Sequence, residues 1–189
     1  MAKVKKAPFT VLYPIPAVLV SCGHEKPNII TLAWVGTVAS TPPQVGISIR
    51  PERYSCGLVE ETGEFVVNIP TAEQARLVDL CGNVSGRDTD KWAETGLTPG
   101  PGLKVKTPII VQCPVNIECR VRHILNLGSH KLFIGEILAV QVNEEILDES
   151  GEIDFEKADP CVYLGGEYWR TGELLGTFGF STRKLNRSE

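Results

Sequence analysis

Four side chains that can bind a phosphate group follow one another closely after a short apolar segment. They are Arg50, Arg53, Tyr54 and Ser55. The segment Val45–Arg50 alternates apolar with small or polar residues, as in a strand with one buried face, and Pro51 ends it because proline has no N–H for the ladder. We expect Ser55 to cap a helix that ends at Gly63. Guanidinium groups, hydroxyls and free helix-start N–H groups favour a small phosphorylated ligand.

A second candidate segment, residues 28–38, combines apolar residues with small ones. As a continuous strand it would place Ile30, Leu32 and Trp34 on one face and Ile29, Thr31, Ala33 and Val35 on the other. The small side chains of Thr31 and Ala33 would let a flat ligand approach the backbone. A core strand that carries one large aromatic residue explains the same pattern, and both interpretations stay open.

Two further segments offer polar groups at predicted turns. Residues 85–92 contain Ser85, Arg87 and Lys91, which are suited to closing over a phosphate group or to forming a solvated turn and a helix cap. His130 follows Gly128 and Ser129 and opens a predicted strand that should border the same end of the fold. A histidine in such a turn can also be merely structural or exposed.

The chain has none of the common sequence motifs for catalysis or nucleotide binding. It has no Gly-x-Ser-x-Gly, no Walker loop, no Gly-x-Gly-x-x-Gly after a strand and no His-Glu-x-x-His. A cofactor is therefore expected to supply the reactive group. The net charge of −4 argues against a nucleic-acid surface, and Lys3, Lys5 and Lys6 form the only basic cluster. No apolar run is long enough to cross a membrane, so we expect a cytoplasmic protein.

The six cysteines have neither metal-site nor disulfide-framework spacing. The two nearest ones, Cys113 and Cys119, have no histidine at finger spacing, and no metal is predicted. Reduced, buried thiols are the expected state in a cytoplasmic protein of this size. A redox role for Cys22, Cys56 or Cys81 is kept as an alternative.

The elements that position these residues are mainly short strands. The 18 Gly and 13 Pro are spread along the chain, which favours strands joined by turns. Thr71 and Gln74 predict a capping box at the start of a helix that ends at Gly82, and a short helix is expected near 89–95. We predict a single, mainly β domain over 1–189 with short helices and a closed or nearly closed barrel, and its C-terminal tail, 160–189, packs on the barrel or on a partner subunit. The expected strands are Val11–Cys22, Ile29–Ser40, Val45–Arg50, Phe65–Ile69, Ile109–Gln112, Val115–Ile124 and His130–Val142.

Seven segments of the chain, taken in order, resemble those of the flavin reductase-like proteins with the FMN-binding split barrel. The resemblance is closest to the flavoredoxin branch of that family. The resemblance covers about Phe9 to Ser181. Ser129 departs from the Gly-Asp-His found in many related reductases. The segments that carry the resemblance are 14–21, 28–34, the Pro42-Pro43 turn, 48–55, 65–70, Ser85-Gly86-Arg87 with Asp90-Lys91, and 128–136.

The resemblance implies a homodimer of split barrels, each of which binds FMN non-covalently near the subunit interface. It places Thr31, Ala33 and Trp34 against the ring or ribityl chain. It places Arg50, Tyr54 and Ser55 at the phosphate, with Ser85 and Lys91 in support, and it assigns Ser48 and Arg53 to the cofactor as well. His130 matches the position that borders the nicotinamide side of the flavin, where it would take part in catalysis. The aromatic tail, including Tyr168 and Trp169, would cover the cofactor or the partner subunit.

The resemblance implies a flavin-dependent NAD(P)H oxidoreductase of the flavin reductase or flavoredoxin type. NADH or NADPH would deliver a hydride to the flavin, and a small molecule or a redox protein would accept the electrons. Because the chain lacks a dinucleotide fingerprint, an FMN-containing electron carrier without direct NAD(P)H oxidation is a real alternative. A barrel without flavin, or with another cofactor such as haem, is a further one.

Overall fold

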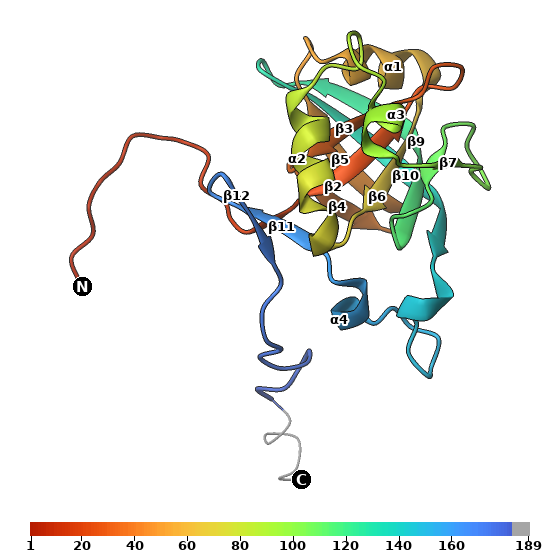
Figure 1. The fold of residues 1–189 in the computed structure, drawn as a ribbon. Helices are drawn as coiled ribbons and strands as arrows, with labels where there is room; N and C mark the ends of the chain where they lie inside the picture. Colours follow the sequence, from red (N-terminus) through yellow and green to blue (C-terminus); the bar gives the residue numbers. More distant parts are fainter. Residues whose placement is uncertain (183–189) are drawn as a thin grey trace.

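A seven-stranded antiparallel sheet forms the body of the protein. The computed structural model describes residues 1–182, so 183–189 of the predicted tail lie outside the described residues. The mainly β fold is as predicted, and Figure 1 shows the sheet with short helices around it. In spatial order the strands are β3 (Asn28–Leu32), β2 (Val18–Cys22), β6 (Glu64–Ile69), β9 (Val115–Asn126), β10 (Lys131–Val142), β5 (Pro43–Ile49) and β4 (Val35–Ser40).

The order of the strands requires the sheet to curl into a barrel. β3 and β4 lie at opposite edges of the sheet, yet only Ala33 and Trp34 separate them in the chain. The two edges must therefore lie side by side. The backbone N–H of Ser48 in β5 donates to the carbonyl of Trp34 at 3.0 Å, which extends the β4–β5 ladder up to this junction. We call this junction the barrel seam.

Both faces of the barrel wall are covered, which explains why β2 is buried at every position. Val18, Val20 and Cys22 point into the barrel, where they pack with residues such as Phe65 and Phe133. Ala17 and Leu19 point outward and pack against helix α2. Alternation along one strand thus supplies two cores, one inside the barrel and one beneath the helices.

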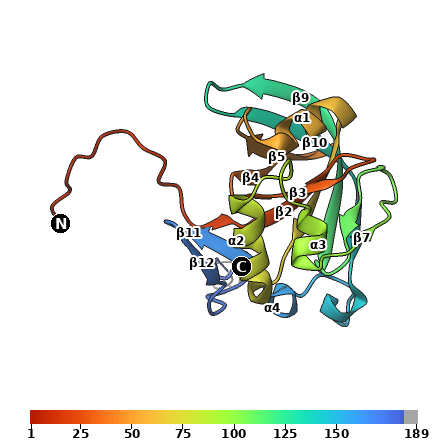
Figure 2. The same ribbon diagram turned by 45° about the horizontal axis from the view of Figure 1, so that its top comes forward.

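The helices lie at the ends and on the outer face of the barrel, as Figure 2 shows. Thr71 and Gln74 form the predicted capping box, which starts a 3₁₀ turn that passes into α2. α2 continues through Gly82, one residue beyond the predicted end, and α3 lies inside the range predicted for a short helix. The helical elements are α1 (Tyr54–Thr62), η1 (Ala72–Gln74), α2 (Ala75–Asn83), α3 (Lys91–Thr95), η2 (Glu144–Ile146) and α4 (Phe155–Ala158).

Three predicted strands differ from the observed ones. The strand predicted over 11–22 begins only at β1 (Ile15–Pro16) and β2, because Pro14 and Pro16 cannot donate to a ladder. The strand predicted over 29–40 divides into β3 and β4 where the chain crosses the seam. The segment 109–112 shortens to β8 (Ile109–Ile110), which pairs with β7 (Pro99–Gly100).

A separate hairpin lies against the outside of the barrel. β11 (Cys161–Leu164) and β12 (Glu167–Arg170) pair with each other, and β11 also pairs with β1. The buried side chain of Cys161 anchors the hairpin in the outer core. The hairpin packs on the barrel because it contributes apolar side chains to that core.

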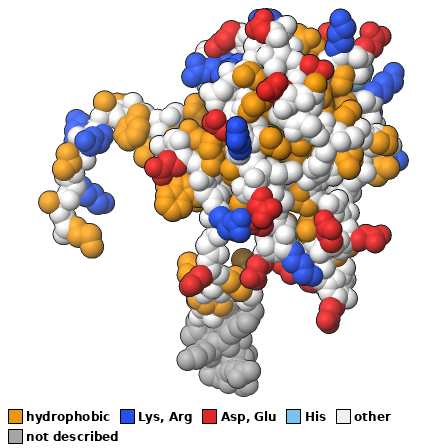
Figure 3. Space-filling view, in the orientation of Figure 1, with side chains coloured by type: hydrophobic (Ala, Val, Ile, Leu, Met, Phe, Trp, Pro, Cys, Tyr) orange, Lys and Arg blue, Asp and Glu red, His pale blue; other side chains and the backbone are white. Residues whose placement is uncertain are grey.

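The two ends of the described chain extend away from the body (Figures 1 and 3). Phe9, Val11 and Leu12 are exposed in the N-terminal segment, and Leu174, Leu175 and Phe178 are exposed after β12. Among the described helices none has both the length and the apolar character needed to cross a membrane.

Candidate functional site

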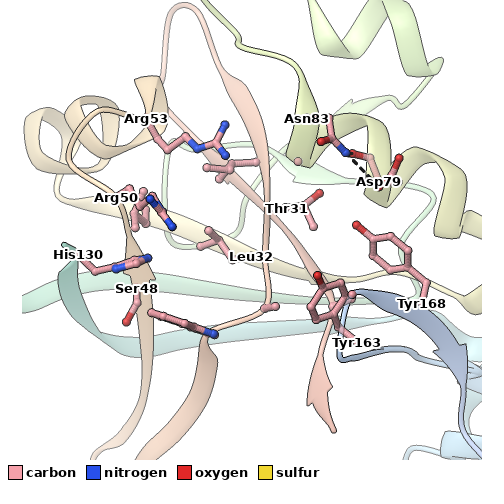
Figure 4. A pocket seen from close by; sticks show the side chains of 17 residues that line it. Thr31, Leu32, Ser48, Arg50, Arg53, Asp79, Asn83, His130, Tyr163 and Tyr168 are labelled. Atoms are coloured by element: carbon pink, nitrogen blue, oxygen red, sulfur yellow. Dashed lines mark hydrogen bonds between the residues drawn. The ribbon is translucent and has the colours of Figure 1, made fainter. Parts of the chain in front are cut away.

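Two adjacent cavities lie at the barrel seam. The seam pocket has a volume of about 450 Å³. It is lined by Ala17, Ile30, Thr31, Leu32, Ala33, Trp34, Ser48, Ile49, Arg50, Arg53, Asp79, Gly82, Asn83, His130, Tyr163, Gly166 and Tyr168 (Figure 4). The cationic pocket has a volume of about 310 Å³. It is lined by Asn28, Ile30, Arg50, Glu52, Arg53, Tyr54, Ser55, Cys81, Val84, Ser85, Gly86 and Lys91. Ile30, Arg50 and Arg53 line both, so one elongated ligand can occupy the two together.

The cationic pocket holds positive charge that the described chain does not neutralise. Lys91 is 3% exposed, and no carboxylate of residues 1–182 forms an ion pair with it or with Arg53. Within residues 1–182 Glu52 forms an ion pair with Arg50, at 3.8 Å, and both of these side chains are largely exposed. Because a buried charge without a counter-ion is costly, this arrangement favours an anionic ligand.

Lys91 is held in place by the backbone of two elements. Its Nζ donates to the carbonyl oxygens of Ile29 and Cys81, each at 2.7 Å. An ammonium group has three N–H donors, so one remains for a ligand. Burial, with a smaller contribution from the nearby positive charge of Arg53, lowers the pKa of Lys91. A bound phosphate group would oppose both effects.

The first turn of α1 forms one wall of the cationic pocket. Its N-cap is Arg53, whose side chain makes no capping hydrogen bond, and the first turn carries no acidic residue. The prediction that Ser55 caps this helix is wrong, because the helix begins one residue earlier, at Tyr54. Ser55 is instead buried, and its Oγ accepts a hydrogen bond from Nδ2 of Asn28 at 2.8 Å. The predicted end at Gly63 is confirmed by a left-handed φ of 65°.

The loop after α2 forms the opposite wall. A Cβ atom added to Gly86 would lie 2.1 Å from Oδ1 of Asn28, so this position must lack a side chain if Asn28 is to hold Ser55. Ser85 accepts a hydrogen bond from the backbone N–H of Arg87 at 3.2 Å. The Arg87 guanidinium lies over the ring of Tyr54, 5.7 Å from its centroid. The loop is therefore fixed to both β3 and α1.

The seam pocket is centred on the bend between β3 and β4. Thr31 donates its hydroxyl proton to the carbonyl of Val78 in α2, which leaves the hydroxyl oxygen to accept from a ligand. The predicted faces hold only up to Leu32. Beyond the bend Val35 packs inside the barrel, whereas Trp34 is 43% exposed at the pocket, because the chain changes direction there.

Trp34 and His130 meet at the mouth of the seam pocket. Their ring centroids are 4.5 Å apart, and Nδ1 of His130 lies 2.9 Å from the Ser129 hydroxyl. Partial burial and the positive charge of Arg50 lower the pKa of His130. The imidazole is therefore neutral at pH 7, and it presents a flat ring rather than a charge.

On the far side of the seam pocket, only Tyr168 was named from the sequence, as part of the aromatic tail. Asp79 and Asn83 project from α2, and Tyr163 and Tyr168 project from the hairpin (Figure 4). Nδ2 of Asn83 donates to Oδ1 of Asp79 at 3.0 Å. Burial and the neighbouring Asp79 raise the pKa of Tyr168 to about 12. In the sequence, only the i, i+4 spacing of Asp79 and Asn83 indicated that these two side chains lie together, and that spacing is common on solvated helices.

The structure brings all the predicted site residues to these two pockets. Thr31, Ala33, Trp34, Ser48 and His130 line the seam pocket. Tyr54, Ser55, Ser85 and Lys91 line the cationic pocket, and Arg50 and Arg53 line both. The main residues that were missed are Asn28, Gly86, Asp79 and Asn83. Their placement depends on contacts between distant segments.

The six cysteines are buried and unpaired, as predicted. Burial raises the pKa of Cys22 to about 12 and that of Cys81 to about 11. Thiols with such pKa values are poor nucleophiles, which weakens the alternative of a redox-active thiol at the site. Within residues 1–182 no group of three His, Cys, Asp or Glu side chains gathers as metal ligands would.

Comparison with known proteins places this geometry in a family. The family described as Flavin reductase like domain matches residues 11–172. The chain is similar to the flavoredoxin of Desulfovibrio vulgaris (Miyazaki F), with 34% identity, a TM-score of 0.90, and coverage of 96% of this chain and 100% of that one. It is similar to a flavoredoxin from Methanosarcina acetivorans, with 32% identity, a TM-score of 0.89, and coverage of 97% and 100%. An FMN-binding protein from Thermus thermophilus, solved with 1-cyclohex-2-enone, has 26% identity, a TM-score of 0.78, and coverage of 94% and 99%.

Proposed function

The chain belongs to the Flavin reductase like domain family, and on this premise we propose that it binds FMN non-covalently and transfers electrons from a reduced nicotinamide nucleotide to an acceptor. One observation carries the proposal. The cationic pocket holds buried, unneutralised positive charge, and it adjoins a second cavity large enough for a flat ring. A phosphate monoester joined to an aromatic ring matches this pair of cavities.

The cationic pocket would hold the phosphate group. Arg53 and Arg50 offer guanidinium donors, Lys91 offers its third N–H, and the first turn of α1 offers free backbone N–H groups. Buried Asn28 fixes the Ser55 side chain in the wall. These donors are set before the ligand arrives, because hydrogen bonds within the protein fix Lys91 and Ser55.

The seam pocket would hold the ring. Its floor is the β3–β4 bend, where Ala33 permits close approach to the backbone and Thr31 presents an acceptor oxygen. Trp34 and His130 border its mouth and leave room for a second planar molecule. When bound, FMN accepts a hydride from a reduced nicotinamide and passes electrons on singly or in pairs. The protein's contribution is orientation, which can lower a barrier by about 7–11 kcal/mol in ideal cases.

His130 would act by position rather than by proton transfer. Its pKa is lowered, so it is neutral at pH 7, and its ring lies against Trp34 at the pocket mouth. A neutral imidazole there can align a nicotinamide ring without repelling the positive charge that this ring gains on oxidation. The hydride step itself needs no acid or base from the protein.

We expect the active form to be a homodimer in the cytoplasm. Exposed apolar side chains at both ends of the described chain, among them Leu12 and Phe178, suit burial against a second copy. The free, buried thiols suit a reducing compartment. The electron acceptor is expected to be a small molecule or a redox protein.

The proposal is tested by spectroscopy under anaerobic conditions. The purified protein, reconstituted with FMN if necessary, is titrated with NADH and NADPH in one cuvette. Bleaching of the flavin bands by either nucleotide supports the reductase. Bleaching only by dithionite contradicts direct NAD(P)H oxidation and favours an electron carrier. Failure to bind FMN contradicts the whole proposal and favours the alternative of a barrel without flavin.

A further inference from the structure

The two sides of the seam pocket differ in the chemistry they present. Figure 4 shows Arg50, Arg53 and His130 on one side and Asp79, Asn83 and Tyr168 on the other. We call the second group the acceptor wall. It joins two elements that are distant in the chain, since Asp79 and Asn83 belong to α2 and Tyr168 belongs to β12.

The hydrogen bonds between Asn83 and Asp79 use up the amide donors and leave acceptors open. Nδ2 of Asn83 donates to Oδ1 of Asp79 at 3.0 Å and to the Asp79 carbonyl at 2.9 Å. The Tyr168 hydroxyl stays protonated, because burial and the nearby charge of Asp79 raise its pKa to about 12. The acceptors that can still bind a ligand are the remaining lone pairs of the Asp79 carboxylate, Oδ1 of Asn83 and the phenol oxygen of Tyr168.

These acceptors are accessible and held in place. Asp79 and Asn83 are exposed within the described chain, and both line the cavity. Tyr168 is half-buried and packs edge-on against Tyr163, with ring centroids 5.5 Å apart. The hairpin therefore fixes the phenol, and Asn83 fixes the carboxylate. A ligand group that carries only carbonyl oxygens would meet an unfavourable surface here.

We propose that the acceptor wall is a recognition subsite for a planar group with an N–H beside a carbonyl, and that Asp79 accepts the hydrogen bond from that N–H. The inference rests on the proposed function, which supplies two sources of this chemistry. One is the imide edge of the flavin ring, and the other is the carboxamide of the nicotinamide. Asn83 acts as the positioning residue that orients the carboxylate, and Tyr168 borders it from the hairpin.

The test compares each ligand with an analogue that lacks the N–H donor. Apoprotein is titrated with FMN and with N3-methyl-FMN, and FMN-loaded protein is titrated with NAD⁺ and with its 3-acetylpyridine analogue, which has no NH₂ group. Each titration measures binding without turnover. If the subsite operates, the wild-type protein prefers the natural ligand of one pair by roughly tenfold, the lower range for a hydrogen bond to a charged acceptor.

The variants show whether that preference comes from the acceptor wall. In Asp79→Ala the preference should fall to about one, and in Asp79→Asn, which keeps the shape and one carbonyl oxygen, it should be intermediate. Tyr168→Phe should reduce it less than Asp79→Ala does. Glu73→Ala is the matched control, because it removes an exposed carboxylate from the adjoining η1 that lines neither pocket.

Each outcome is decisive for the inference. Loss of the FMN preference in Asp79→Ala assigns the subsite to the imide edge, and loss of the NAD⁺ preference assigns it to the carboxamide. If both preferences survive in Asp79→Ala and in Asp79→Asn, the inference is wrong while FMN binding still stands. If the wild-type protein binds no FMN, the proposed function fails and the inference fails with it. Circular dichroism of each variant identifies any loss of folding.

Discussion

The two pockets at the barrel seam adjoin each other but are built in different ways. The cationic pocket depends on buried groups, since Asn28, Ser55 and Lys91 are nearly inaccessible and have fixed partners. The seam pocket is bordered by exposed or half-exposed side chains, such as Trp34, His130 and Asp79. We infer that the first pocket is ready for its ligand and supplies affinity, whereas the second positions the reacting ring and supplies selectivity.

The largest effect should follow from removing the buried cation. Lys91→Met leaves two buried carbonyl oxygens without a donor and removes the unneutralised charge. We expect FMN to bind about 100-fold more weakly. Riboflavin, which lacks the phosphate, should bind as it does to the wild-type protein. Titration of apoprotein by flavin fluorescence measures both constants. A parallel loss of riboflavin binding would mean that the variant also damages the seam pocket, and it would contradict the separate roles of the two pockets.

Removing one of the exposed guanidinium groups should have a smaller effect of the same kind. Arg53→Ala should weaken FMN binding roughly 30-fold, because one charge-assisted contact to phosphate is lost. Arg122→Ala is a suitable control, since Arg122 pairs with Glu136 outside both pockets. If Arg53→Ala and the control bind FMN equally well, Arg53 does not contact the phosphate.

The pH dependence of binding should follow Lys91. Its pKa is lowered in the free protein, and a bound phosphate raises it again, so binding takes up a proton between these two pKa values. Above the second pKa of the phosphate, which is about 6, FMN affinity should be constant up to the lowered pKa of Lys91 and then fall by up to about tenfold per pH unit as the pH rises. The stability of the apoprotein should rise over the window between the lowered pKa and 10.5, because the unfolded state holds more protons there.

Lys91→Met should abolish this alkaline decline in affinity. Calorimetric titration of the wild-type protein and the variant at a series of alkaline pH values makes the comparison. A decline of the same size in both proteins would show that another group titrates.

A methyl group at Gly86 tests how rigid the cationic pocket is. Gly86→Ala places a Cβ atom against Asn28 and should displace its bond to Ser55. We expect about 1–3 kcal/mol less stability and roughly fivefold weaker FMN binding. Gly57→Ala, in α1, is the matched control because a Cβ atom there meets nothing within 4 Å. Thermal unfolding should show that this control is neutral or slightly stabilising.

The smallest effect on FMN affinity should come from the mouth of the seam pocket. His130→Ala should change FMN affinity by less than about threefold, since its contact is ring packing with Trp34 and not a bond to the phosphate. It should slow flavin reduction by NADH or NADPH more than it weakens binding, by about tenfold. Stopped-flow absorbance measures that rate. A large loss of FMN affinity with an unchanged rate would reverse the roles given to the two pockets.

The sequence predicted the cationic pocket better than the seam pocket, for a physical reason. Arg50, Arg53 and Tyr54 lie on one strand-to-helix connection, so local patterns are enough to group them. The capping box of Thr71 and Gln74 was predictable for the same reason. The N-cap was misassigned by two positions, because Tyr54 already adopts the helical conformation, the N-cap is Arg53 and no side chain caps the helix.

The seam pocket depends on long-range geometry that local patterns do not contain. The bend at Ala33 and Trp34 exists because the two outer strands of a curled sheet must meet there, and nothing in the residue types marks it. Asp79 and Tyr168 meet only once the hairpin packs against α2. For this reason the strand predicted over 29–40 from alternation alone was wrong in crossing the seam without a break.

The most direct test of the central claim is the ratio of the dissociation constants of FMN and riboflavin for the wild-type apoprotein. If the cationic pocket binds the phosphate group, FMN should bind at least about 100-fold more tightly, because several charge-assisted contacts act on the phosphate alone. Equal affinities would show that the unneutralised charge of Arg53 and Lys91 serves another purpose, and they would contradict the account of this site.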